Sequence, residues 1–151
     1  MQKKERTDKT VTDILVCFGD YQQIKESSMQ KNGENFIIEV TGKSYYCPVE
    51  LSMDVIGGKW KAVILWYLID NTLRFHELKK EISSISERVL TRELRQLENY
   101  RLIKRKVYPE VPPRVEYCLT DFGKKLIPLL NQISKFGETY AKNYGEIRKD
   151  S

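Results

Sequence analysis

The chain has 151 residues, of which 40% are hydrophobic, and 26 Lys and Arg outnumber 21 Asp and Glu for a net charge of +5. This size suits one globular domain with a short appendage, and no apolar stretch approaches the roughly 20 residues that span a bilayer. The N-terminus lacks the apolar region of a signal peptide, and three widely spaced cysteines favour reduced thiols over a disulfide framework. We therefore expect a cytoplasmic protein with no membrane partner.

Residues 1–46 form an N-terminal extension in which seven basic residues balance seven acidic ones. Apolar residues at helical spacing behind Thr10, followed by Gly19, predict a short helix. Asn32-Gly33 is a turn signal, and residues 36–40 are strand-like. The extension can lengthen a dimer interface, act as a mobile arm or sense an effector, and its residues favour the packing role.

The next segment predicts helices. Residues 54–70 are largely apolar around Gly57 and Gly58, which predicts one central helix whose glycines allow close packing of another backbone. Residues 73–75 form a short extended link, and residues 76–82 form a second short helix before a serine-rich turn.

Residues 86–100 predict a helix with a basic face. Leucines recur at the spacing of a buried stripe, and Ser86 is suited to cap the helix. Arginine, glutamine and asparagine gather on the opposite side, and these side chains match base edges in the major groove. A solvated surface is the ordinary explanation of a charged helix face, but this one carries no interleaved lysine or glutamate and a basic hairpin follows it. The expected DNA-contacting residues of this helix are Ser86, Arg88, Val89, Arg92, Arg95, Gln96 and Asn99.

Residues 108–117 predict a stiff hairpin, because three prolines fix φ and remove backbone donors at its tip. Residues 86–114 hold eight basic and four acidic residues, so this segment supplies +4 of the total +5. A basic hairpin beside a helix in a groove can reach the phosphate backbone. The expected DNA-contacting residues of this wing are Arg105, Tyr108, Pro112 and Arg114.

A final helix is expected from Thr120 or Asp121, because apolar residues keep helical spacing for about five turns. Pro128 should bend it. The whole succession predicts a mainly α fold with a small β wing, which is a winged helix-turn-helix.

Several motifs together resemble the HxlR-type winged helix-turn-helix regulators of bacteria, which are relatives of the MarR proteins. The resemblance covers about residues 47–145 and leaves 146–151 as a C-terminal tail. The residues that carry it are Cys47-Pro48-Val49-Glu50, Gly57-Gly58-Lys59-Trp60, Arg74-Phe75, Glu77-Leu78, Val89-Leu90-Thr91, Leu94, Leu97, the hairpin, Leu119-Thr120 and Gly123.

The resemblance implies a homodimeric transcription factor whose third core helix enters the major groove while the wing follows the backbone or minor groove. It implies dimerisation through flanking helices, here residues 47–51 and the helix from Asp121. The arginine face together with the long apolar terminal helix predicts that a homodimer binds a pseudo-palindromic duplex operator. Two turns depart from the family pattern: Tyr100-Arg101 replaces a pair ending in glycine, and Asn71-Thr72 replaces Gly-Pro. The first change should force a non-glycine residue into the left-handed region, at a cost of about 1 kcal/mol.

Cys47 directly precedes Pro48, a residue favoured at the first position of a helix. Free N–H groups at a helix start favour the thiolate, which is the nucleophilic and oxidisable form. The resemblance also implies that Cys47 senses oxidants or electrophiles, as cysteines at this position do in several HxlR-type regulators. The alternative is a small buried residue that never reacts.

Enzymatic readings find no support, because the single histidine, His76, cannot build a histidine-based metal site and no phosphate-binding or nucleophile motif is present. We expect no catalytic residue, metal or cofactor. Regulation by a small-molecule or oxidant effector remains an alternative. The competing function is a winged helix that contacts only proteins, with its arginines solvated.

Overall fold

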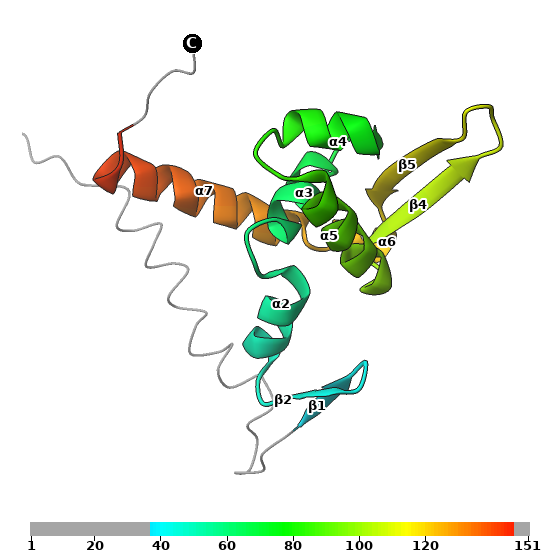
Figure 1. Ribbon diagram of the computed structural model, residues 1–151. Coiled ribbons are helices and arrows are strands. Elements are labelled where there is room, and N and C mark those ends of the chain that lie inside the picture. The colour runs from blue at the N-terminus through cyan, green and yellow to red at the C-terminus, as the bar shows by residue number, and fades with distance from the viewer. Residues whose placement is uncertain (1–36, 147–151) are drawn as a thin grey trace, which may run out of the picture. The chain divides into compact units, whose positions relative to one another are not determined.

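The computed structural model describes residues 37–146 and is mainly helical with two small antiparallel sheets (Figure 1). This confirms the expected fold class. The chain divides into two compact units between Ser52 and Met53. The helix expected behind Thr10 and the turn at Asn32-Gly33 lie outside the described residues.

In the first unit, the strand-like run of residues 36–40 is confirmed as β1 (Ile38–Val40), while Phe36 itself lies outside the described residues. β1 pairs antiparallel with β2 (Lys43–Tyr45), a strand that the sequence analysis missed. The two connecting residues, Thr41 and Gly42, have φ of 52° and 76°, as a two-residue hairpin turn requires.

The single helix expected over residues 54–70 is wrong. The chain instead forms α2 (Pro48–Ile56) and α3 (Lys61–Tyr67), with a break at the glycine pair. Gly58 has φ of 83°, which favours glycine, and a Cβ on Gly57 would collide with the Met53 carbonyl oxygen of the preceding turn. The glycines therefore end a helix, and they do not admit a neighbouring backbone.

α3, α4 (Phe75–Glu81) and α5 (Glu87–Asn99) build the core of the second unit. α4 and α5 are joined by a five-residue connection, so together they form the expected helix-turn-helix. Each helix contributes side chains that are almost inaccessible to solvent: Ile64 and Leu65, then Leu78, and then Leu90, Leu94 and Leu97. The predicted leucine stripe is confirmed.

The expected wing is confirmed as a hairpin of β4 (Ile103–Tyr108) and β5 (Arg114–Leu119). β3 (Leu73–Arg74), the extended link of the sequence analysis, adds a third strand, so the sheet order is β3-β5-β4. The hairpin projects from the helical core in Figure 1, with α5 beside its base.

At the C-terminal end of α5, a non-glycine residue adopts the left-handed conformation that usually favours glycine. Arg101 has φ of 58°, which confirms the expected left-handed residue. Its N–H donates to the Glu98 carbonyl at 2.9 Å, and the Leu102 N–H donates to the Leu97 carbonyl at 3.0 Å. This is the Schellman arrangement, in which the apolar pair Leu97 and Leu102 is also buried.

The last helix is not continuous, which corrects the expected bend at Pro128. Thr120 caps α6 (Asp121–Lys124) by accepting a 2.9 Å hydrogen bond from the Gly123 N–H, as predicted. α7 (Ile127–Tyr144) then starts anew, with Pro128 in its first turn. A proline there needs no N–H partner, so it begins a helix and does not distort one.

Candidate nucleic-acid interface

α5 presents a polar face opposite its buried leucines. Ser86 caps the helix, and its hydroxyl accepts a 3.3 Å hydrogen bond from the Val89 N–H. Among the seven expected contact residues on this helix, Ser86, Arg88, Arg92, Arg95 and Asn99 are exposed, while Val89 and Gln96 are half-buried. The structure therefore places an exposed arginine and asparagine surface on the second helix of the helix-turn-helix.

Arg92 is less free than its neighbours on this face. It donates to Oε1 of Glu93 at 2.7 Å and 3.1 Å, and the other Glu93 oxygen lies 3.5 Å from Nζ of Lys61 in α3. Glu93 is buried, so this carboxylate fixes α5 against α3 and holds the Arg92 side chain in place. The sequence analysis missed Glu93, although its position three residues after Leu90 and four before Leu97 places it on the buried stripe.

Arg114, expected to contact phosphate, is engaged within the wing. Its guanidinium lies 2.9 Å from Glu110, 3.3 Å from Glu116 and 3.9 Å from the centre of the Tyr108 ring. A hydrogen bond with Glu116 also raises the pKa of the Tyr108 phenol. Arg114 and Tyr108 thus brace the hairpin, while Pro112 is exposed at its tip.

The basic run of β4 divides between two faces of the sheet, because successive side chains on a strand point in opposite directions. Lys104 and Lys106 line a hollow of about 340 Å³ together with Cys118 and Lys124. Arg105 points to the opposite face, toward α5. The strand therefore presents a single basic side chain, Arg105, to the side that α5 occupies.

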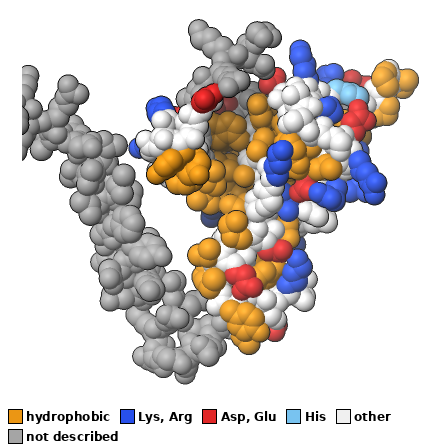
Figure 2. Space-filling model, turned by 60° about the vertical axis from the view of Figure 1, so that its left-hand side comes forward, with side chains coloured by type: hydrophobic (Ala, Val, Ile, Leu, Met, Phe, Trp, Pro, Cys, Tyr) orange, Lys and Arg blue, Asp and Glu red, His pale blue; other side chains and the backbone are white. Residues whose placement is uncertain are grey.

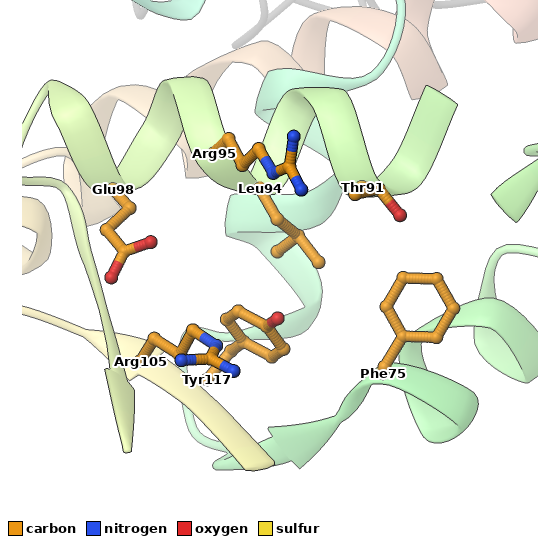
Figure 3. A pocket seen from close by; sticks show the side chains of 7 residues that line it. All are labelled: Phe75, Thr91, Leu94, Arg95, Glu98, Arg105 and Tyr117. Atoms are coloured by element: carbon orange, nitrogen blue, oxygen red, sulfur yellow. The ribbon is translucent and has the colours of Figure 1, made fainter. Parts of the chain in front are cut away.

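A second hollow, of about 310 Å³, lies between α5 and the wing (Figure 3). Arg95 lies at its rim, and Arg105 approaches from the strand below. The remaining lining residues are Phe75, Thr91, Leu94, Glu98 and Tyr117. Figure 2 shows several lysine and arginine side chains, in blue, distributed over one face of the molecule.

In the first unit, Cys47 stands directly before α2 and is exposed. Its Sγ accepts a hydrogen bond from the Glu50 N–H at 3.3 Å, and the Glu50 carboxylate accepts one from the Tyr46 N–H at 2.8 Å. The sulfur therefore occupies the capping position that the sequence predicted. Among the described residues Cys47 is not buried, whereas the alternative assumed burial.

α7 carries an apolar surface that is not covered within the described residues. The exposed fractions are 44% for Ile133, 69% for Phe136, 57% for Tyr140 and 78% for Tyr144. Neighbouring rings along this surface lie 6.1 Å and 5.0 Å apart. A helix with such a surface needs a partner to remove its apolar area from water.

Among residues 37–146 no helix is long and apolar enough to cross a membrane. That same part of the chain holds no group of three or more His, Cys, Asp or Glu side chains that could bind a metal ion.

The HxlR-like helix-turn-helix family matches residues 55–144 of the chain. An HTH-type transcriptional regulator of Methanothermobacter thermautotrophicus is 51% identical over 105 residues, which cover 68% of this chain and 80% of that protein. The HTH-type transcriptional regulator YdeP of Bacillus subtilis is 49% identical over 94 residues, covering 62% and 73% of the two chains.

Two similar solved structures are a redox regulator and a transcriptional regulator. The redox regulator HypR in its oxidized form has a TM-score of 0.60 and 43% identity, covering 70% of this chain and 100% of that chain. Diamide-treated YodB from B. subtilis has a TM-score of 0.52 and 30% identity, covering 67% and 97%. These similarities confirm the winged helix-turn-helix fold and the resemblance found in the sequence.

Proposed function

The chain belongs to the HxlR-like helix-turn-helix family, and from this premise we propose that it is a transcriptional regulator that binds a specific double-stranded DNA operator as a homodimer. The observation that carries the proposal is the exposed surface of Arg88, Arg95 and Asn99 on α5, next to a basic wing. Its relatives are transcriptional regulators, and this role places the protein with the chromosome in the cytoplasm. The division of the chain into an extension (residues 1–46), a DNA-binding domain and a tail (residues 146–151) remains a prediction.

Selection of bound duplexes from a random library tests the DNA-binding role. We expect enrichment of a pseudo-palindromic sequence and an affinity that falls linearly with salt on a logarithmic scale, because bound arginines release counterions from phosphates. Arg88→Ala should weaken the selected duplex, while Lys43→Ala on the β1-β2 hairpin should not. A protein that enriches no sequence would favour the alternative, a winged helix used only for protein contacts.

The apolar surface of α7, which no other described residue covers, supports the homodimer. Two recognition helices related by a twofold axis should meet half-sites about one helical turn apart, ~10 bp, or a multiple of it. Light scattering should show a dimer, and Phe136→Asp should give monomers because it puts a charge into the apolar contact. A strictly monomeric wild-type protein would exclude this assembly.

We further propose that oxidants regulate the protein through Cys47. The exposed, capping position of its sulfur supports this, as does the similarity to the redox regulator HypR and to YodB, which is known in reduced and diamide-treated forms. Two Cys47 thiols of a dimer would lose two electrons and two protons to diamide, which becomes the hydrazine, as the intersubunit disulfide forms. The bridge would move the two recognition helices and release DNA.

A further inference from the structure

The hollow between α5 and the wing brings together two arginines that are 10 residues apart in sequence. Arg95 comes from the outer face of the recognition helix, and Arg105 comes from the side of β4 that faces it (Figure 3). A volume of about 310 Å³ corresponds to roughly ten water molecules at about 30 Å³ each. This is enough space for a tetrahedral anion and its hydration water.

Both guanidinium groups keep their donors available. Within residues 37–146, neither Arg95 nor Arg105 has a side-chain hydrogen bond or an ion pair, and Glu98 in the same hollow pairs with neither. Arg92 and Arg114, in contrast, are each held by carboxylates. The arginines that line the hollow are therefore the ones equipped for an external anion.

We propose that Arg95 and Arg105 bind one and the same phosphate of the DNA backbone, held in the hollow between α5 and the wing. This inference rests on the proposed function. A helix in the major groove and a wing beside it straddle the backbone strand that separates the two grooves. The phosphates of that strand pass the space between the two elements, which is where the hollow lies.

The chemistry of the hollow fits a phosphate. Arginine forms paired, charge-assisted hydrogen bonds with phosphate oxygens, and the apolar walls of Phe75, Leu94 and Tyr117 strengthen them by excluding water. Glu98 leaves the hollow with one net positive charge, so its carboxylate weakens anion binding without cancelling it. Arg95 then positions the protein on DNA, and base reading falls to Arg88, Arg92 and Asn99.

A scan with neutral methylphosphonate linkages tests the shared phosphate. Each backbone position of the selected operator is replaced in turn, and affinity is measured for the wild type, Arg95→Ala, Arg105→Ala and the double variant. One position should weaken wild-type binding by about ten- to hundredfold, since an interaction with a charged group is lost. The loss of affinity caused by methylphosphonate at that position should disappear in the double variant and be smaller in each single variant.

Arg88→Ala is the matched control, because it removes a recognition-helix arginine that does not line the hollow. It should keep the full methylphosphonate effect at this position. Glu98→Gln should tighten binding of the unmodified operator and increase its salt dependence. If Arg95→Ala and Arg105→Ala abolish sensitivity at different positions, or at none, the shared site is refuted while DNA binding stands. A wild type with no sequence preference would refute the proposed function and the shared site with it.

Discussion

The hydroxyl of Tyr100 donates a 2.9 Å hydrogen bond to Oδ2 of Asp54, 46 positions earlier in the chain. Tyr100 caps the C-terminus of the recognition helix, and Asp54 belongs to the last turn of α2. The bond therefore ties the end of α5 to the helix that begins after Cys47.

Tyr100→Phe should lower the free energy of unfolding by about 1 kcal/mol, because a partly buried hydrogen bond to a carboxylate is lost and the ring stays. Urea denaturation measures it. Tyr46→Phe is the control, since its side chain is 74% exposed and its removal of a hydroxyl should change little. Equal effects of the two substitutions would show that the bond to Asp54 contributes nothing.

Glu93→Ala should destabilise the protein by about 3 kcal/mol, because it leaves Lys61, whose side chain is 12% exposed, without its carboxylate partner. Glu98→Ala on the same helix should cost less than about 0.5 kcal/mol, because that side chain is exposed and forms no ion pair within residues 37–146. The double substitution Lys61→Met with Glu93→Leu should recover most of the loss, since it removes both charges. Denaturant unfolding of the three variants measures these effects, and a destabilised double variant would contradict the explanation.

Arg101→Gly should stabilise the protein by about 1 kcal/mol, because glycine adopts the observed φ of 58° without a Cβ penalty. Arg101→Ala provides the control: it removes the same side chain but keeps the Cβ, so it should bring no gain. Thermal unfolding compares them. A similar melting temperature for the glycine and alanine variants would mean that the Schellman turn is not strained.

Local patterns in the sequence were sufficient for α5, the wing and the Thr120 cap, because period, turn residues and caps act over a few neighbouring residues. Local patterns gave the wrong structure where one residue type can serve two structural roles. Gly57 was read as a packing position when it ends α2, and Pro128 was read as a bend when it begins α7. The hollow could not be predicted from the sequence, because Arg95 and Arg105 line it together only as a result of how the wing packs against α5.

Arg92 and Arg114 should affect DNA binding in different ways. Arg92→Ala should cost about 1 to 3 kcal/mol of binding free energy and relax specificity at one base pair, as loss of a base contact does. Arg114→Ala should weaken all sequences alike, because it loosens the hairpin: Glu110 loses its ion-pair partner, and Glu116 keeps only Arg74. Affinities for operator and scrambled duplexes at several salt concentrations measure this. Equal, sequence-independent losses would contradict the division.

Cys47→Ser should leave operator binding intact and abolish its loss on treatment with diamide. The reason is that the sulfur is exposed at the start of α2, where an oxidant can reach it. Glu50→Gln should react faster than the wild type, because the attacking form of a thiol is an anion and the substitution removes a negative charge near the sulfur. Fluorescence anisotropy follows DNA release, and non-reducing electrophoresis follows the intersubunit disulfide, which a thiol reductant should reverse.

Cys118→Ser is the matched control, since that half-buried thiol lies on the wing and should not alter the response. Release of the operator by an oxidised Cys47→Ser protein would leave Cys47 as a helix cap with no sensing role.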